Sequence, residues 1–240
     1  LHWKIGESKE YFPQVGQERR AVNFNYYREK ELVNVKFRDA EKNFKMVSGA
    51  ELVFYGLDNI KEMDTVYIVE GELDALSLHE CGLYSVCSVP NGASKGNARL
   101  EYLDNCFSYF ETKKKIILCT DNDEAGLELR NELARRFGAY RCKYVEFGDY
   151  KDANEVLIEK GNQALRDYIQ DSKNFPLEGV LNIDDIWQNV LNYNENGVKN
   201  YSIGLPNSDD YFRLAFGEWT VVTGIPNSGR SGSNMLQYGG

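Results

Sequence analysis

Three acidic motifs occur in a fixed order between residues 66 and 155, and each holds carboxylates close together in the chain. The motifs are Glu70-Gly71-Glu72-Leu73-Asp74, Asp121-Asn122-Asp123 and Lys151-Asp152-Ala153-Asn154-Glu155. Carboxylates that converge in one crevice repel each other unless a cation lies between them, and hard oxygen ligands of this kind suit Mg²⁺. The motifs therefore predict a divalent metal site, and phosphoryl transfer is the first chemistry to expect there.

Each motif is expected where a strand gives way to a helix. The runs 66–69 and 116–119 are short, apolar and bounded by polar residues, which is typical of buried strands. The expected elements are strands 65–69, 84–89, 115–119 and 141–147 and helices 73–81, 99–110, 124–137 and 154–160. This alternation predicts an α/β fold with a mostly parallel sheet and helices on both faces. Functional side chains then gather beyond the carboxyl ends of the strands.

The segment before this alternation is β-rich and basic. Residues 21–27 and 32–37 are two predicted strands joined by a charged turn, and residues 43–47 add a third. Between residues 19 and 45, eight basic residues stand against four acidic ones, although the whole chain has a net charge of -9. A basic face beside an acidic metal crevice is what a nucleotide-polymerising site requires. A solvated hairpin with scattered charges is the alternative interpretation.

The order of the acidic motifs resembles that of the TOPRIM domain, the metal-binding catalytic module of bacterial-type primases, topoisomerases and some nucleases. Segments upstream and downstream extend the resemblance to phage-type primase-helicases and their organellar relative Twinkle. These segments are Val35-Lys36-Phe37-Arg38-Asp39, Lys42-Asn43-Phe44-Lys45, Phe54-Tyr55-Gly56 and Thr223-Gly224-Ile225-Pro226-Asn227-Ser228-Gly229. The expected domains are a basic β-rich subdomain at 1–62, a TOPRIM catalytic domain at 63–175, a linker with an amphipathic helix at 176–202 and the start of a RecA-like helicase domain at 203–240.

The resemblance implies DNA-templated synthesis of short RNA primers by Mg²⁺- or Mn²⁺-dependent nucleotidyl transfer. The expected catalytic residues are Glu70, Asp121 and Asp123, and the expected metal ligands are these three and Asp152. The expected nucleotide- and template-binding residues are Lys36, Arg38, Lys42, Lys45, Asn91 and Lys151. Asp74 and Asp123 also lie where helices begin, and a carboxylate there stabilises the first turn, so a purely structural role stays open for both.

The last third of the chain carries two further patterns. The residues that recur at the spacing of one helical face are Ile183, Ile186, Trp187, Val190 and Leu191. This linker helix is expected to pack on a neighbouring subunit of a ring, or to fold back on its own primase domain. The residues that follow a P-loop frame are Gly224, Gly229, Arg230 and Ser231. Arginine replaces the lysine that should reach the outer phosphates, so we expect no helicase or ATPase activity from this chain.

Length and composition fit a piece of a longer protein, since the sequence begins with Leu1 rather than Met and stops at residue 240. No apolar stretch approaches the roughly 20 residues of a membrane span, so we expect no membrane association. The expected location is the cytoplasm of a bacterial or phage-infected cell, or an organelle in a eukaryote. The five cysteines contain no Cys-x-x-Cys pair, which favours buried thiols and no zinc site.

Two other functions use the same residues. A TOPRIM-type nuclease would cleave phosphodiesters with these carboxylates, although it would leave the basic subdomain and the P-loop frame unexplained. A non-catalytic assembly fragment of a replicative helicase would depend on the linker helix instead. For the primase interpretation, the expected partners are single-stranded DNA template, ribonucleoside triphosphates and other subunits of a ring helicase.

Overall fold

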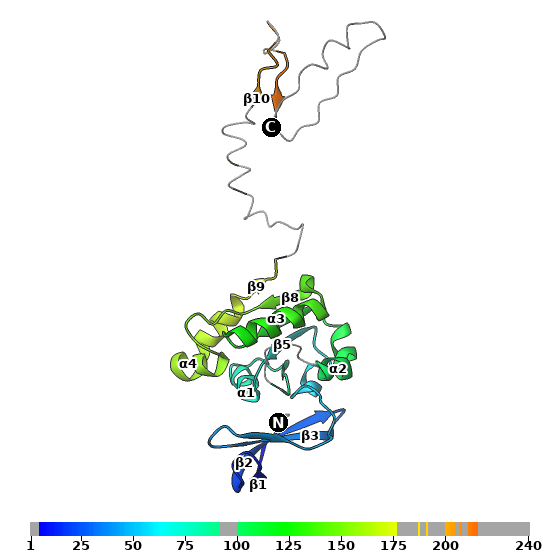
Figure 1. The fold of residues 1–240 in the computed structure, drawn as a ribbon, viewed down its shortest axis with the longest axis vertical. Coiled ribbons are helices and arrows are strands. Elements are labelled where there is room, and N and C mark those ends of the chain that lie inside the picture. Colours follow the sequence, from blue (N-terminus) through cyan, green and yellow to red (C-terminus); the bar gives the residue numbers. More distant parts are fainter. Residues whose placement is uncertain are drawn as a thin grey trace. The chain divides into compact units, whose positions relative to one another are not determined.

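The computed structural model describes residues 5–91, 100–176, 187, 191, 200–204, 207 and 211–215. The chain divides into two compact units, residues 1–178 and 179–240. The described part of the second unit contains a short antiparallel ladder of β10 (Asn200–Tyr201) and β11 (Leu214–Ala215). The described part of the first unit contains two larger sheets and four α-helices (Figure 1). The predicted P-loop residues and most of the predicted linker helix lie outside the described residues.

The first unit opens with an antiparallel sheet in the order β1-β2-β3-β4. Its strands are β1 (Ile5–Phe12), β2 (Gln17–Arg28), β3 (Glu31–Asp39) and β4 (Phe44–Met46). Glu29 and Lys30 both have positive φ in the tight connection of β2 to β3, as a two-residue hairpin turn demands. Their backbone N–H groups each donate to Asp58, at 2.8 Å, which ties the hairpin to the segment before the second sheet.

The second sheet has the order β6-β5-β7-β8-β9, and its first four strands are parallel. The strands are β5 (Thr65–Val69), β6 (Val86–Ser88), β7 (Lys115–Cys119), β8 (Cys142–Tyr144) and β9 (Lys173–Asn174). β9 runs antiparallel to β8. Val69 at the end of β5 pairs with Ser88 on one side and Cys119 on the other, so these three strands end level. The predicted mostly parallel sheet is confirmed.

Four helices flank this sheet: α1 (Glu72–Glu80), α2 (Glu101–Glu111), α3 (Glu124–Phe137) and α4 (Ala153–Gln170). Helix α1 connects β5 to β6, whereas α2 connects β6 to β7 and α3 connects β7 to β8. Because each crossover is right-handed, α1 lies on one face of the sheet, and α2 and α3 lie on the other. Accordingly α1 packs against α4, while the Phe110 and Phe137 rings of α2 and α3 meet at 4.7 Å between centroids. After β5 the chain continues to β6 on one side of the sheet, and after the adjacent strand β7 it continues to β8 on the other side. This reversal of direction between neighbouring strands leaves a crevice beyond their carboxyl ends.

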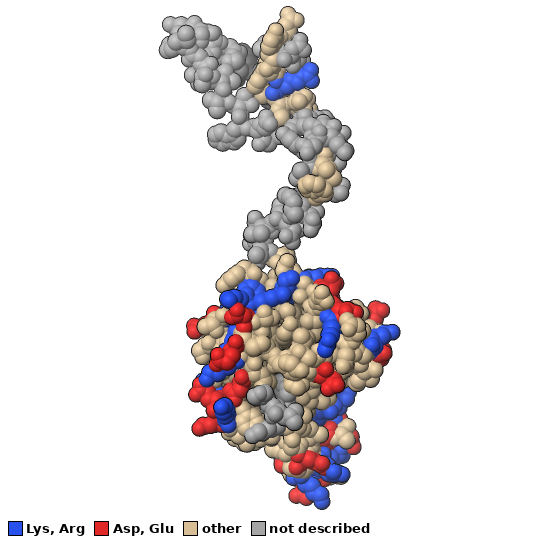
Figure 2. All heavy atoms as spheres, turned by 180° about the vertical axis from the view of Figure 1, so that it is seen from behind, with Lys and Arg blue, Asp and Glu red and all other residues tan. Residues whose placement is uncertain are grey.

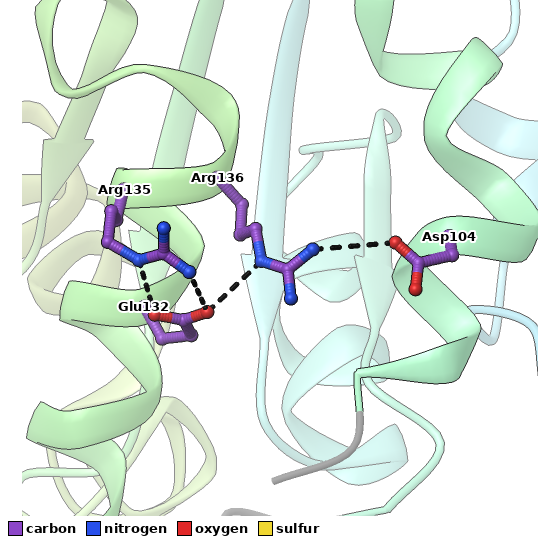
Figure 3. A network of polar contacts seen from close by, with 4 residues as sticks. All are labelled: Asp104, Glu132, Arg135 and Arg136. Atoms are coloured by element: carbon purple, nitrogen blue, oxygen red, sulfur yellow. Dashed lines mark hydrogen bonds and ion pairs between the residues drawn. The ribbon is translucent and has the colours of Figure 1, made fainter. Parts of the chain in front are cut away.

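Charged side chains also join α2 and α3 at the surface (Figure 3). Glu132 accepts hydrogen bonds from Arg135 and Arg136, and Arg136 reaches Asp104 of α2 at 3.5 Å. The two guanidinium groups, Arg135 first, lower the pKa of Glu132 to about 2. Because these side chains are solvent-accessible, such pairs add little stability, and the buried ring contact carries the packing of the two helices.

Several elements differ from the sequence prediction, and the unpredicted strands β1 and β9 and the length of α4 are among them. The helix expected at 154–160 continues to Gln170, because the chain resumes helical geometry after Gly161, whose φ of 81° interrupts it. Leu165 and Ile169 bury the added turns in the core. Strand β1 was not predicted, because its residues from Gly6 to Glu10 are glycine and polar residues with no apolar alternation, and only Phe12 is buried.

The five cysteines are buried free thiols, as the sequence predicted. Burial raises the pKa of the Cys106 and Cys142 thiols to about 11, which keeps both protonated at neutral pH. Within the described residues, no helix is long and apolar enough to cross a membrane.

Candidate metal centre and nucleotide cleft

The carboxyl ends of β5 and β7 bring the first two acidic motifs together. Glu70 directly follows β5, and Asp121 lies two residues beyond β7. The backbone N–H of Asp121 donates to Oε2 of Glu70 at 3.3 Å, as expected of strands that end level in neighbouring positions. The third motif joins them because the backbone N–H of Asn122 donates to the carbonyl of Lys151 at 2.7 Å.

Three carboxylates from the three motifs form one group. Asp74, Asp121 and Asp152 each offer an oxygen, and these oxygens lie within 4.8 Å of one another. Asp74 and Asp121 are buried and Asp152 is half-buried. Asp74 comes from the first turn of α1 and Asp152 is the N-cap of α4, so strand ends and helix starts converge on the group.

Local backbone contacts fix these positions. A Cβ at Gly126 would lie 2.2 Å from the carbonyl oxygen of Asp121, so only glycine lets the first turn of α3 approach this backbone so closely. Oδ1 of Asp74 accepts from the backbone N–H of Asn154 at 3.0 Å, which links the beginnings of α1 and α4. Oδ1 of Asp152 accepts from the backbone N–H of Glu155 at 2.8 Å.

The carboxylates carry more negative charge than their surroundings offset. Burial and the neighbouring Asp152 raise the pKa of Asp74 to about 8. Burial also raises the pKa of Asp121, although its ion pair with Lys151 opposes this rise. A divalent cation among the three oxygens would favour the ionised forms and remove the repulsion. The donor set of buried carboxylate oxygens therefore fits a hard divalent cation.

The acidic group opens into a cavity of about 770 Å³ between the two sheets of the first unit. Glu70, Asp74, Asp121 and Asp152 line one side, and residues of β3, β4 and their connection line the other. All six residues predicted to bind nucleotide or template line this cavity; they are Lys36, Arg38, Lys42, Lys45, Asn91 and Lys151. The residues predicted from the sequence therefore line the same cavity, although they lie far apart in the chain.

The basic side of the cavity is partly neutralised by its own contacts. Nζ of Lys36 donates to Glu72 at 2.7 Å and to the carbonyl of Pro90 at 2.9 Å, and Tyr26 also donates to Glu72. Nζ of Lys45 pairs with Glu10 at 2.7 Å. Two of the four predicted basic contacts of this wall thus already have carboxylate partners.

Arg38 and Lys42 complete this wall in a different way. The guanidinium of Arg38 lies 5.8 Å from the centre of the Phe44 ring. Phe44 pairs with Arg38 across β3 and β4, so both side chains share one face of the sheet. Lys42 lies exposed in the connection between these strands, where its φ is 65°. Both cations can therefore face a ligand in the cavity.

Only some of the four predicted metal ligands belong to the group of three carboxylates. Asp121 and Asp152 belong to the group of three carboxylates, and Glu70 lies beside it. Asp123 is exposed, and its Oδ1 accepts from the backbone N–H of Gly126 at 2.9 Å as the N-cap of α3. Among the described residues, Asp74 is the member of the group absent from the predicted ligands. The signal for it was present, because three acidic residues alternate between positions 70 and 74.

Comparisons with known proteins agree with this architecture. A family model described as Toprim-like matches residues 67–157. The chloroplastic/mitochondrial Twinkle homolog protein of Arabidopsis thaliana is 36% identical over 233 residues, which cover 88% of this chain and 32% of that protein. The primase homolog protein of the same plant is 37% identical over 175 residues, or 65% of this chain and 52% of that one. The chain thus spans about a third to a half of the length of these curated relatives.

A solved structure has a similar fold over 70% of this chain. The crystal structure of the primase fragment of the bacteriophage T7 primase-helicase protein matches with a TM-score of 0.56 and 25% identity, covering 70% of this chain and 66% of that one. The matched Toprim-like segment contains all three acidic motifs and the parallel strands that place them. This chain therefore carries a TOPRIM domain of the Twinkle-like and phage-type primase kind.

Proposed function

We propose that this chain is the primer-synthesising part of a DNA primase, joined to a ring helicase in the full-length protein. The observation that carries the proposal is the single cavity in which three converging carboxylates face the cations of a separate sheet. A polymerising site needs both walls, since the carboxylates hold cations at the reacting phosphate while basic side chains hold nucleotide or template. The similarity to a Twinkle homolog and to a primase homolog supports the same function.

Asp74, Asp121 and Asp152 are the residues that would hold Mg²⁺ or Mn²⁺. When bound, the metal would offset the charge of the incoming triphosphate during attack by the primer hydroxyl. Glu70 is half-buried beside Asp121, and we assign it the role of accepting the proton of that hydroxyl. Asp123 fixes the start of α3 and adds negative charge next to Asp121, which makes it a further contributor to metal binding.

Arg38 and Lys42 are the proposed contacts to phosphate groups, because neither side chain is committed to a buried carboxylate. Asn91 lies exposed at the edge of the same cavity and would contact the nucleotide. Lys36 and Lys45 contribute through their ion pairs: the pair of Lys36 with Glu72 links β3 to α1, and the pair of Lys45 with Glu10 links β4 to β1 of the same sheet. The proposed template is single-stranded DNA, and the proposed substrates are ribonucleoside triphosphates.

The test supplies the 240-residue chain with single-stranded DNA carrying a short annealed RNA, labelled ribonucleotides and Mg²⁺. Extension of the RNA, lost in Asp121→Asn, is the expected result. Shortened DNA in place of extended RNA would identify a nuclease instead. Unchanged RNA and DNA, in a chain that binds both Mn²⁺ and template, would favour a non-catalytic assembly fragment.

A further inference from the structure

A lysine already lies on the central carboxylate of the metal centre. Nζ of Lys151 is 2.7 Å from Oδ2 of Asp121, while the side chain of Asp121 is 11% exposed and that of Lys151 is 58% exposed. The surface pair of Lys114 with Asp64 has a similar distance of 2.6 Å, yet its carboxylate is 65% exposed. Lys151 thus places the ammonium of a solvent-exposed side chain on a carboxylate that is itself nearly buried.

The backbone of Lys151 is held by hydrogen bonds, while more than half of its side-chain surface is open to solvent. Its carbonyl accepts from the N–H of Asn122, next to Asp121, and its own N–H donates to the side chain of Glu155. The following residue, Asp152, is both a member of the carboxylate group and the N-cap of α4. The ammonium is therefore delivered to Asp121 by a fixed backbone, and it can leave without disturbing the carboxylates.

An ammonium and a divalent cation compete for the same oxygen. A metal ion held by Asp74, Asp121 and Asp152 must approach within about 2.1 Å of its oxygens. Nζ of Lys151 already lies 2.7 Å from Oδ2 of Asp121. Two cations about 4 Å apart repel each other by several kcal/mol at the effective dielectric of a partly exposed site. The single charge of Lys151 also offsets less of the negative charge of this group than a divalent ion would.

We propose that Lys151 is an internal counter-ion of the metal-free centre, which a divalent cation displaces and which then becomes available to a phosphate of the bound nucleotide. The inference rests on the proposed function, because it takes the carboxylates as the metal site. Its consequence is that metal binding releases a cation toward the cavity. Metal and nucleotide then strengthen each other's binding, since a nucleotide without metal meets a lysine that is engaged elsewhere.

The test measures Mn²⁺ affinity of the full 240-residue chain by the electron paramagnetic resonance signal of free Mn²⁺. Lys151→Met is expected to bind Mn²⁺ about 3- to 10-fold more tightly than the wild type in the absence of nucleotide. Lys151→Arg keeps the charge and is expected to stay near the wild type. Lys42→Met is the matched control, because it removes one positive charge from the same cavity away from Asp121, and its affinity is expected to change less than twofold.

A second measurement separates displacement from a general effect of charge. Saturating ATP should tighten Mn²⁺ binding to the wild-type protein beyond Mn²⁺ binding to ATP alone, and this gain should be lost in Lys151→Met and kept in Lys151→Arg. Equal or weaker Mn²⁺ binding by Lys151→Met, or an equal rise in Lys42→Met, would overturn the role of Lys151 and leave the metal centre standing. A wild-type chain that binds no Mn²⁺ would overturn the proposed function as well. Where Lys151→Met is insoluble, Lys151→Gln replaces it.

Discussion

The two walls of the cavity differ in how their charges are positioned. On the acidic wall, strand ends and helix starts set the places of Asp74, Asp121 and Asp152, and the backbone itself brings them together. On the basic wall, Lys36 and Lys45 extend from an antiparallel sheet to partners of their own. Like charges are thus concentrated on one wall and largely paired on the other. A count of charges along the chain predicts the first wall well and overstates the second.

The outer surface shows the same pairing. In Figure 2, basic and acidic side chains of the first unit alternate around the rim of the visible face, and its centre is mostly uncharged. Among the basic residues between positions 19 and 45, Arg19 pairs with Glu41 and Arg28 pairs with Glu51, so their charges are offset locally. In the proposed function, contacts to nucleic acid would therefore rest on Arg38 and Lys42, the two cations of this wall for which no buried carboxylate partner is described.

The largest expected effect comes from the acidic wall. Asp121→Asn removes the charge at the centre of the carboxylate group, and metal-assisted charge stabilisation is worth several kcal/mol. We expect primer extension to fall by about 1,000-fold or more, since 1.36 kcal/mol corresponds to a factor of ten in rate. Single-turnover extension of an annealed RNA at saturating nucleotide measures this.

Asp149→Asn is the control for that substitution, because Asp149 is exposed in the connection that follows β8 and carries the same change of charge. It should leave extension within twofold of the wild type. A comparable loss in both variants would mean that total charge, rather than the position of Asp121, governs the rate.

The next effect comes from the basic wall and concerns stability rather than chemistry. Lys36→Met leaves Glu72 buried without its cation, and breaking a buried pair by removing one partner costs about 3 kcal/mol or more. We expect a lower midpoint in urea unfolding for Lys36→Met and a nearly unchanged one for Lys42→Met. Lys36→Met combined with Glu72→Gln should recover part of the loss. An unchanged midpoint in Lys36→Met would place Lys36 among the open phosphate contacts instead.

Much of the fold could be predicted from local sequence patterns, whereas the candidate site could be predicted from them only in part. The predicted strands ending at Val69 and Cys119 are the neighbours that form the crevice, because short apolar runs between polar residues have few other stable solutions. The pairing of Lys36 with Glu72 joins residues 36 positions apart and needed the packing of two sheets. Position 74 shows the same limit, since a carboxylate in the first turn of a helix is stabilising whether or not it faces a metal.

A smaller effect is expected on how the stability of the folded protein changes with pH, and it tests whether Asp74 is buried. The pKa of Asp74 is about 8 in the folded protein, against a usual value of 3.8. Below about pH 4 the group is neutral in both states, and as pH rises toward 8 the folded protein loses stability, because only the unfolded chain ionises freely. Asp74→Asn removes this loss. In EDTA we expect the variant to be more stable than the wild type at pH 9, with little difference at pH 4.

The metal reverses the sign of that difference. With saturating Mn²⁺ at pH 7.5, the wild type should gain more stability than Asp74→Asn, because an ion that binds only the folded state stabilises it in proportion to its affinity. Urea unfolding in EDTA at pH 4 and pH 9 measures the first part, and urea unfolding at pH 7.5 with and without Mn²⁺ measures the second. If Asp74→Asn were less stable than the wild type at pH 9 in EDTA, the ionised Asp74 carboxylate would not be destabilised by its burial.

The smallest expected effect is on the open part of the basic wall, and it decides how the two walls share the work. If Arg38 contacts one phosphate, Arg38→Ala should lower the slope of log affinity for single-stranded DNA against log salt concentration by about 0.7, because one contact fewer releases counter-ions. Lys45→Ala should change that slope less, since Nζ of Lys45 is paired with Glu10 and lies 5.1 Å from the centre of the Phe37 ring. Fluorescence anisotropy at four salt concentrations gives both slopes. Equal slopes for Arg38→Ala and the wild type would leave the acidic wall as the part of the cavity that engages ligand, with metal as its bridge to the nucleic acid.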